Sequence, residues 1–546
     1  MTRLLRSPLA GILALALALR LAGLFWGLPA ADGWDDDGFA PRNFLTALAL
    51  TYKPGAFFTY PPLHAFILAI LSLPAALTAL WHAHSLSQAD IVGEFTKPQY
   101  MTVFAVVARL VNIILSLGLI AIVGRMADML ASRRAGLLAA GALTLNMTFT
   151  YYGQVSNLEV PYLFWSALSL LLVMEGMARQ QARLFFWAAL AAAAAITTKD
   201  QAYAVFALSL PLAMGLWLAR DTWPRTNLKS LALYAVIAIA AILLVDGAVT
   251  NPAGFMHRIA FLTGPASGDY AAYTHGVMGR MRLLADMILS FTGGISALAT
   301  LLAVLGLWRA ARGGRIWALV PAFATLSFTI AFNMVALRLD ARFLLPQAIF
   351  ACVYIGVAAD WLLGASRSRV APMALALLGL LSLIPAMAVG AGMVRDPRYD
   401  AERWLAAHAV GKSVETYGQN AYLPRFPAGI TVWRVGDGPL NVRNPLPGVG
   451  EVRAPFGEAR HPDFIVVSNW WARHYITPEP SGAGLKPPPR FQMQYDGTPA
   501  RAYFTALYAG TAGYHLAHRA APVQGAWPLV HIHESLNETV DIFARD

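Results

Sequence analysis

Long apolar runs recur between residues 8 and 390, and they restrict what this chain can fold into. About 20 apolar residues in a helix cross the hydrocarbon core of a bilayer while satisfying every backbone polar group internally. The 546-residue sequence is 57% hydrophobic and only 13% charged, whereas a soluble domain has roughly 25% charged residues. We therefore expect a polytopic α-helical membrane protein with about eleven transmembrane helices. The expected spans lie near residues 8–28, 103–123, 135–150, 160–177, 184–198, 202–219, 231–249, 283–308, 316–334, 343–362 and 370–390.

Arginine and lysine alternate between the loops that join these runs. When the N-terminus with Arg3 and Arg6 is placed inside, every second loop is basic and the intervening loops are not. This positive-inside pattern predicts a cytoplasmic N-terminus and an uncleaved first helix, which is longer than the roughly 7–15 apolar residues of a signal peptide. The same loops account for the net charge of +11. Because no basic patch is interleaved with aromatic residues, we expect no nucleic-acid partner.

The apolar run from Pro62 to Trp81 is an exception to the count. If it crossed the membrane, every later loop would invert, so we interpret it as an interfacial or half-inserted helix pair in a long outer loop, residues 29–102. Residues 1–390 then form the membrane module, and residues 391–546 form an extracytoplasmic α/β domain. In this domain we expect a helix at Asp400–His408, strands at Lys412–Tyr417, Ile430–Val435, Phe464–Ser468 and Val540–Arg545, and a loop over 436–462.

Three consecutive carboxylates, Asp35, Asp36 and Asp37, follow the first apolar run. Neighbouring carboxylates repel one another and attract cations, so stability alone does not explain them. One interpretation is that they cap the helix expected at Phe39–Thr51, because carboxylates favour a helix N-terminus. The other is that Asp35 or Asp36 is a general base or a metal ligand at the membrane surface. The two roles are compatible.

A further acidic residue, Glu159, precedes the apolar helix after the next outer loop, with Pro161 near its first turn. A helix-start role would account for both residues. The topology also brings Glu159 to the same membrane face as Asp35 and Asp36, where acids from two loops would share a metal or polarise one acceptor. Asp36 and Glu159 are therefore the candidate metal ligands.

Three cationic residues at outer helix ends are candidate phosphate ligands. Arg338 and Arg342 are four residues apart and would share one helical face if the helix extends that far. A guanidinium matches the geometry of a phosphate, although both arginines would also serve as interfacial anchors that pair with Asp340. Lys199 lies in a tight outer hairpin. It is a second phosphate contact or a snorkelling residue paired with Asp200.

Arg20 and the histidine pairs have weaker signals. Arg20 lies in the outer half of the first span, where an arginine is costly unless it is paired, so we expect it to snorkel to the acidic loop or to contact an anionic headgroup. The His-x-His pairs at 82/84 and 531/533 have no third ligand at a metal-site spacing, and we interpret them as structural. The single cysteine, Cys352, excludes an internal disulfide.

In their order and spacing, these segments resemble the GT-C superfamily of integral-membrane glycosyltransferases, and most closely the dolichyl-phosphate-mannose–protein mannosyltransferase-like group that includes bacterial aminoarabinose transferases. The resemblance covers nearly the whole chain, and Glu159 takes the place of the commoner Asp. The matching segments are Asp35-Asp36 with Phe39-Ala40, Tyr60-Pro61-Pro62-Leu63, Glu159-Val160-Pro161, Thr198-Lys199, Arg342-Phe343-Leu344-Leu345-Pro346, Asp396-Pro397-Arg398-Tyr399 and the terminal segment Asn537–Arg545.

The resemblance implies an inverting transfer of a sugar from a polyprenyl-phosphate donor to an acceptor hydroxyl on the outer face of the membrane. Arg342, with Lys199 and Arg338, would hold the donor phosphate as leaving group. Asp35 or Asp36 would deprotonate the acceptor, assisted by Glu159.

The resemblance also implies the partners and the location of the protein. The acceptor would be a protein, a glycolipid or a polysaccharide, and the protein would lie in a bacterial-type inner membrane with its C-terminal domain outside. No nucleotide is expected, while a divalent metal ion stays open because the members of the group differ. The alternative function is a transporter or flippase for lipid-linked glycans, which would need opposed half-sites and broken helices at mid-membrane.

Overall fold

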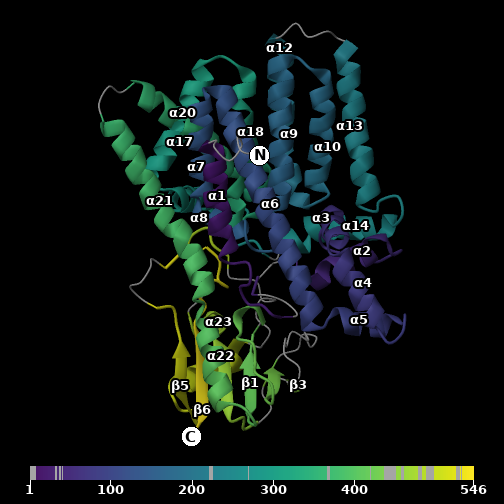
Figure 1. The fold of residues 1–546 in the computed structure, drawn as a ribbon, viewed down its shortest axis with the longest axis vertical. Helices are drawn as coiled ribbons and strands as arrows, with labels where there is room; N and C mark the ends of the chain where they lie inside the picture. The colour runs from purple at the N-terminus through teal and green to yellow at the C-terminus, as the bar shows by residue number, and fades with distance from the viewer. Residues whose placement is uncertain are drawn as a thin grey trace.

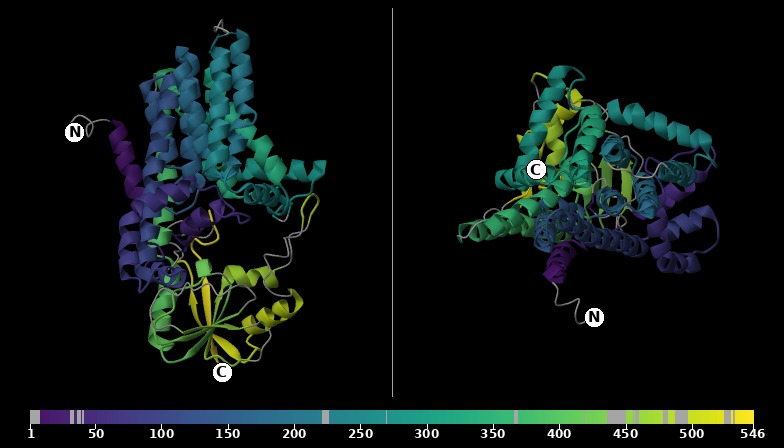
Figure 2. Two further views of the ribbon diagram at one scale, coloured as in Figure 1. Left: turned by 90° about the vertical axis from the view of Figure 1, so that its right-hand side faces the viewer. Right: turned by 90° about the horizontal axis from the view of Figure 1, so that it is seen from above.

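The computed structural model describes residues 8–30, 34–35, 39, 41–220, 226–268, 270–365, 369–418, 420–435, 450–454, 456, 460–477, 482–486, 497–523, 529–530 and 532–546. A group of helices occupies one end of the molecule, and a twisted sheet with the C-terminus occupies the other (Figure 1). Figure 2 shows the same arrangement from two further directions, with the N-terminal helix α1 on the outside of the helical group.

The helical part is built from a long series of elements. They are α1 (Pro8–Leu21), α2 (Pro41–Tyr52), α3 (Leu63–Leu71), α4 (Leu73–His82), α5 (Gln88–Phe95), α6 (Pro98–Leu130), α7 (Arg133–Thr144), α8 (Met147–Tyr152), α9 (Glu159–Arg179), α10 (Ala182–Ile196), η1 (Asp200–Ala202), α11 (Tyr203–Phe206), α12 (Ser209–Arg220), α13 (Thr226–Val245), α14 (Pro252–Thr263), α15 (Pro265–Gly268), α16 (Val277–Ile295), α17 (Ala297–Arg312), η2 (Ile316–Leu319), α18 (Val320–Phe328), η3 (Thr329–Asn333), α19 (Met334–Ala336), η4 (Ala341–Leu344), α20 (Leu345–Ala365) and α21 (Val370–Val394).

Within the described residues, seven helical segments are long and apolar enough to cross a membrane, or up to nine if each of two bent helix pairs counts as one span. The expected polytopic membrane fold is confirmed, but the expected number of eleven is not. Three of the expected spans contain α1, α7 and α10, which have only 14, 12 and 15 residues, fewer than the about 20 that a crossing needs.

The bent pairs are α3–α4, which turns by 66°, and α16–α17, which turns by 103°. The first pair covers the run from Pro62 to Trp81, so its interpretation as a helix pair is confirmed. Its position at the membrane surface stays a prediction.

Glycines allow the central helices to approach closely. A Cβ atom added to Gly306 of α17 would lie 1.9 Å from the carbonyl oxygen of Tyr354 in α20. A Cβ added to Gly356 would lie 2.4 Å from the carbonyl oxygen of Ala135 in α7. Small residues at helix interfaces are the usual means of packing helices in a membrane, where dispersion rather than water exclusion drives association. The helices α17, α20 and α7 thus form a tight centre.

The C-terminal part is a six-stranded sheet with the order β3-β2-β1-β4-β6-β5. The first four strands in this order are parallel to one another, and β6 runs antiparallel to both of its neighbours, β4 and β5. The elements are α22 (Pro397–His408), β1 (Ser413–Tyr417), η5 (Asn420–Tyr422), β2 (Thr431–Val435), β3 (Gly450–Ala454), β4 (Phe464–Ser468), α23 (Asn469–Ile476), α24 (Gly497–Tyr508), β5 (Tyr514–Ala520) and β6 (Val540–Arg545).

The structure confirms the expected helix and all four expected strands of this part, and it corrects the expected loop. Residues 450–454, within the predicted loop 436–462, form β3 at one edge of the sheet. The segment contains Glu451 and Arg453 and has no apolar run, so its strand character comes from pairing with β2 rather than from its own sequence. The domain boundary after residue 390 stays a prediction.

The sheet and the helices are joined by a buried polar contact. The indole Nε1 of Trp26 donates a hydrogen bond to Asp396 Oδ2 (2.8 Å), and Arg398 Nη2 forms an ion pair with the same carboxylate oxygen (2.6 Å). Arg398 also donates to the carbonyl oxygen of Ser535 (2.6 Å). These contacts place the carboxyl ends of the parallel strands next to the helical part, while the C-terminus lies at the far end (Figure 1).

Candidate active site

Glu159, Lys199 and Arg342 come together although they lie far apart in the sequence. Lys199 Nζ lies 2.5 Å from Glu159 Oε2, and Arg342 Nε lies 4.0 Å from Glu159 Oε1. Asp340 adds a second carboxylate, whose Oδ2 lies 3.3 Å from Arg342 Nε. The carboxylate of Glu159 is completely buried. We call these four residues the charge cluster.

Local sequence places each member of the charge cluster at a helix end. Glu159 is the first residue of α9, and its backbone N–H donates to the side chain of Asn157 (3.0 Å). Pro161 fits this first turn because the N–H that proline lacks would have no partner there. Asp340 caps η4, since its Oδ1 accepts from the backbone N–H of Arg342 (3.1 Å). Lys199 is extended and ends the turn after α10.

Two buried tyrosines border the charge cluster. The hydroxyls of Tyr152 and Tyr162 are both buried, and that of Tyr152 has no hydrogen-bond partner among the described residues. Burial, reinforced by the negative charge of Asp340, raises the pKa of Tyr152 well above its usual value. The Tyr152 hydroxyl therefore stays protonated at neutral pH and is a hydrogen-bond donor facing a charged site.

The carboxylate of Asp35 is bound by Arg109 and Ser156, which lie outside the charge cluster. The carboxylate accepts hydrogen bonds from Arg109 Nη2 (2.7 Å) and Nε (3.2 Å), and from Ser156 N (2.9 Å) and Oγ (2.8 Å). These four hydrogen bonds engage both oxygens of the Asp35 carboxylate. Asp36, the other candidate for the base, lies outside the described residues. The structure thus ties the start of the acidic loop to the loop that precedes α9.

Backbone hydrogen bonds continue this connection between the outer loops. Phe39 N donates to the carbonyl oxygen of Ser156 (2.6 Å), and Leu63 N donates to that of Thr197 (3.0 Å). Asp35 and two residues that follow the acidic triplet are therefore held against the segments that carry Glu159 and Lys199. The expectation that these loops share one face of the protein agrees with these contacts.

Arg338 and Arg342 do not share a helical face as expected. Helix α19 ends at Ala336, before both arginines, and Asp340 between them is extended (φ −152°, ψ 149°), so no helix joins Arg338 to Arg342. Arg338 packs its guanidinium over Tyr270 instead, 5.0 Å from the ring centroid. The expected pairing with Asp340 is observed for Arg342 at 3.3 Å and, at the limit of 4.0 Å, for Arg338.

Two other expected pairings are corrected by the structure. Lys199 pairs with Glu159 rather than with its neighbour Asp200, which faces Arg258 at 3.5 Å. Arg20 does not snorkel: it is fully buried, and its guanidinium lies over the ring of Phe149, 4.8 Å from the centroid.

Sequence reasoning missed Arg109, which binds Asp35. A signal was present, because Arg109 is an ionisable residue inside the span expected at 103–123, and such residues are costly in a membrane unless they are paired. Ser156 gave no comparable signal. It lies in the noted loop, but its contact with Asp35 depends on the fold.

The charge cluster does not suit Glu159 as a metal ligand. Lys199 occupies one of its oxygens at 2.5 Å, and Arg342 faces the other, so a cation would have to displace two positive side chains. No group of three or more metal-ligating side chains is found in the described part of the chain. Metal binding through Asp36 stays a prediction, and we derive no step through a metal.

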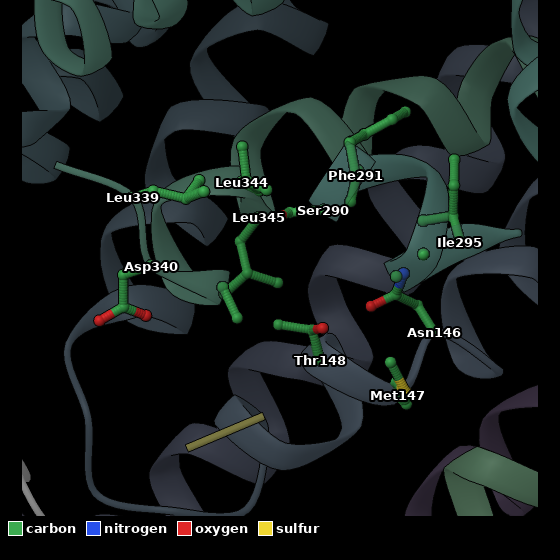
Figure 3. Close-up of a pocket in the computed structure, with 14 residues that line it drawn as sticks. Asn146, Met147, Thr148, Ser290, Phe291, Ile295, Leu339, Asp340, Leu344 and Leu345 are labelled. Carbon is green, nitrogen blue, oxygen red and sulfur yellow. The ribbon is translucent and has the colours of Figure 1, made fainter. Parts of the chain in front are cut away.

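A pocket of about 290 Å³ lies beside Asp340. Figure 3 shows Asp340 at one side of this pocket and the side chains of Leu339, Leu345, Phe291 and Ile295 around it. Phe291 and Ile295 belong to the end of α16, just before the 103° bend to α17. A mostly apolar pocket thus borders the charge cluster at the bend of a broken helix pair.

The long apolar helices, the bent helix pairs and the C-terminal sheet define a polytopic membrane protein with a C-terminal sheet domain. Among solved structures, the chain is similar to apo ArnT from Cupriavidus metallidurans, with a TM-score of 0.50 and 14% identity over 98% of this chain and 97% of ArnT. This likeness confirms the expected resemblance at the level of the fold.

Two further solved structures match less well. ArnT bound to undecaprenyl phosphate, from the same organism, has a TM-score of 0.47 with 14% identity over 98% of this chain and 97% of that chain. The apo oligosaccharyltransferase from Archaeoglobus fulgidus has a TM-score of 0.42 with 12% identity over 76% of this chain. The match covers 62% of the archaeal protein, which is less than two thirds of its length. No family model and no curated protein sequence matches the chain.

Proposed function

We propose that the protein is an inverting glycosyltransferase that moves a sugar from a polyprenyl-phosphate donor to an acceptor hydroxyl on the outer face of the membrane. The observation that carries this proposal is the charge cluster beside an apolar pocket in a GT-C fold. Arg342 and Lys199 supply two positive charges for a phosphate, and the pocket next to Asp340 suits the first apolar units of a polyprenyl tail. The two cationic side chains match the phosphate of such a donor, and the pocket matches its lipid tail.

The cationic side chains would act mainly on the leaving group. As the bond between the anomeric carbon and the phosphate oxygen breaks, its electron pair stays on the phosphate, and the negative charge there rises. Preformed donors in a site that excludes water stabilise such charge more than water does. Arg342 and Lys199 fit this role, and Glu159 compensates them when no phosphate is bound. Arg338, which is partly exposed and lies over Tyr270, is the outer member of the set.

The acceptor hydroxyl would be activated by an acid of the first outer loop. Its oxygen forms the new bond to the anomeric carbon from the side opposite the phosphate, and its proton passes to a carboxylate. Of the two candidates, Asp36 suits this role better, because Asp35 is already held by Arg109 and Ser156. Asp35 then positions the loop rather than accepting the proton.

The acceptor and the location of the protein belong to the same proposal. A protein, a glycolipid or a polysaccharide with an accessible hydroxyl would serve as acceptor, in a bacterial-type inner membrane with the sheet on the outer side. The transporter alternative is not favoured. A transporter would need a site at mid-membrane between opposed half-sites, whereas the charge cluster lies at helix ends.

Sugar transfer in reconstituted membranes tests the proposal. Wild-type protein, Asp36→Asn, Arg342→Ala and Lys199→Ala are supplied with a panel of polyprenyl-phosphate sugars and an envelope extract as acceptor. Arg403→Ala is the matched control, because this arginine of α22 is exposed and remote from the charge cluster. We expect transfer by the wild type and the control and its loss in the three variants. Transfer that survives in Arg342→Ala and Asp36→Asn would refute the assigned site, and no turnover of any donor by the wild type would refute the function.

A further inference from the structure

The C-terminal sheet contains a topological switch point, where successive strands are added on opposite sides of β1. From β1 the chain adds β2 and β3 on one side, and then β4 on the other side of β1. In open parallel sheets, ligands bind at such a switch point, outside the carboxyl ends of the two diverging strands. Here these ends are Tyr417 of β1 and Ser468 of β4.

A pocket of about 550 Å³ lies next to the carboxyl end of β4. Its wall includes Asn469, Trp470 and Arg473 from α23, and His533 and Glu538 from the segment before β6. Glu538 is buried and accepts hydrogen bonds from Ser468 Oγ (2.8 Å) and Trp470 N (2.9 Å). The pocket therefore adjoins β4, one of the two strands at the switch point, and lies between α23 and the segment before β6.

Aromatic side chains connect this pocket to the charge cluster. The ring of His533 stacks on Tyr151 of α8, with centroids 5.9 Å apart and an interplanar angle of 11°. Tyr151 in turn contacts Tyr152, 5.0 Å between centroids, and Tyr152 is buried within the electrostatic influence of Asp340, Arg342 and Glu159. Two tyrosines of one short helix thus lie between the pocket and the proposed donor site.

The lining of the pocket combines apolar surface with several kinds of hydrogen-bonding group. Trp470 and Ile532 offer apolar surface, whereas Asn469, Arg473 and Glu538 offer an amide, a guanidinium and a carboxyl. A sugar ring has the complementary character, because its C–H faces are apolar and its hydroxyl edges both donate and accept hydrogen bonds. The volume is within the range of small-molecule sites.

We propose that this pocket is the acceptor site and that the acceptor is a saccharide or carries one. This assignment rests on the proposed function, since the pocket would deliver a hydroxyl across Tyr151 and Tyr152 to the sugar held at the charge cluster. It narrows the acceptor to a glycan-bearing molecule, with a specificity set by α23 and the segment 529–539.

Binding of defined trisaccharides to the full-length protein in lipid nanodiscs tests this assignment. The probes are maltotriose, cellotriose and chitotriose. Arg473→Ala removes an exposed guanidinium from the pocket wall, and Ala521→Trp fills part of the pocket. Arg403→Ala is the control, and thermal unfolding of each variant confirms that it is folded. Binding of polyprenyl phosphate is measured on the same samples.

We expect at least one trisaccharide to bind the wild type and the control, with at least tenfold weaker binding in both pocket variants and unchanged binding of polyprenyl phosphate. The assignment is overturned if no trisaccharide binds, or if the pocket variants bind as the wild type does. Absence of polyprenyl-phosphate binding in the wild type would instead refute the proposed function, and with it the acceptor role, whatever the trisaccharides do.

Discussion

Asp35 and Arg109 lie 74 residues apart in the chain and form a buried ion pair in which the guanidinium donates two hydrogen bonds to one carboxylate. Arg109 also donates to the carbonyl oxygen of Leu24 (2.8 Å), so one side chain of α6 holds both the end of the first helical segment and the start of the acidic loop. The ion pair thus fixes Asp35 to α6.

Replacement of Arg109 by methionine should therefore destabilise the protein and abolish activity. An uncompensated carboxylate would be left buried, which costs about 3–5 kcal/mol. Denaturant unfolding in detergent measures the loss of stability. The double variant Arg109→Met, Asp35→Leu should recover much of that stability but no transfer activity, because the loop is no longer held. Full activity of the double variant would contradict a positioning role.

Glu159 competes with a bound phosphate for the same cations. Glu159→Gln should consequently bind polyprenyl phosphate more tightly than the wild type, by about tenfold, which corresponds to roughly 1.4 kcal/mol. Equilibrium binding of labelled polyprenyl phosphate measures this change, and Glu175→Gln, at the other end of α9, is the matched control. Weaker binding in Glu159→Gln would mean that Glu159 supports the phosphate site instead of occupying it.

Lysine should replace Arg342 only in part. The guanidinium contacts Asp340 and faces Glu159 through a planar group, a geometry that an ammonium does not reproduce. We expect the turnover number to fall by about 10²–10³-fold in Arg342→Ala, with partial recovery in Arg342→Lys. Single-turnover transfer from a polyprenyl-phosphate sugar is the measurement. Equal rates in both variants and the wild type would place the phosphate elsewhere.

Stability should depend on pH through Glu538. Burial raises the pKa of Glu538 to about 7 in the folded protein, from an ordinary value of 4.5. Between these values the unfolded chain has released this proton while the folded protein retains it, so rising pH favours unfolding, and the penalty levels off above pH 7. Glu538→Gln should remove the penalty and gain stability relative to wild type, by roughly 3 kcal/mol at most at pH 8 and much less at pH 5.

Unfolding midpoints of both proteins at the two pH values measure this effect. Asp463 at the far end of β4 offers a contrast, because hydrogen bonds from Ser413 lower its pKa. Asp463→Asn should destabilise the protein at pH 8. A gain for Glu538→Gln that is equal at both pH values would show that burial does not perturb this carboxyl group.

The polytopic membrane fold could be predicted from the sequence, because a helix that crosses a bilayer needs a run of about 20 apolar residues. The strands β1, β2, β4 and β6 were also predictable, since each has its own apolar residues. The strand β3 was not, because Glu451 and Arg453 lie on an edge that only pairing with β2 creates. The expected number of eleven spans stays unconfirmed, because three of the expected runs contain helices of only 14, 12 and 15 residues.

The candidate site was predictable in its residue types but not in its pairings. Glu159, Lys199 and Arg342 were each noted for their place at a helix end, and the fold brings them together. Their partners depend on local backbone conformations that have no clear sequence signature, such as the extended Asp340 that separates Arg338 from Arg342. Asp35 and Asp36 look alike in sequence, and the sequence gives no sign that Arg109 and Ser156 bind Asp35.

The orientation of the sheet has a consequence for how such a protein can diversify. The turns after β1 and β4 meet the helical part, whereas the opposite ends of these strands and the C-terminus point away from it. Insertions and substitutions in those turns would alter the surface presented to incoming molecules without passing through the packed membrane helices. Under the proposed function, homologues could therefore exchange one acceptor for another during evolution while retaining the same polyprenyl-phosphate donor.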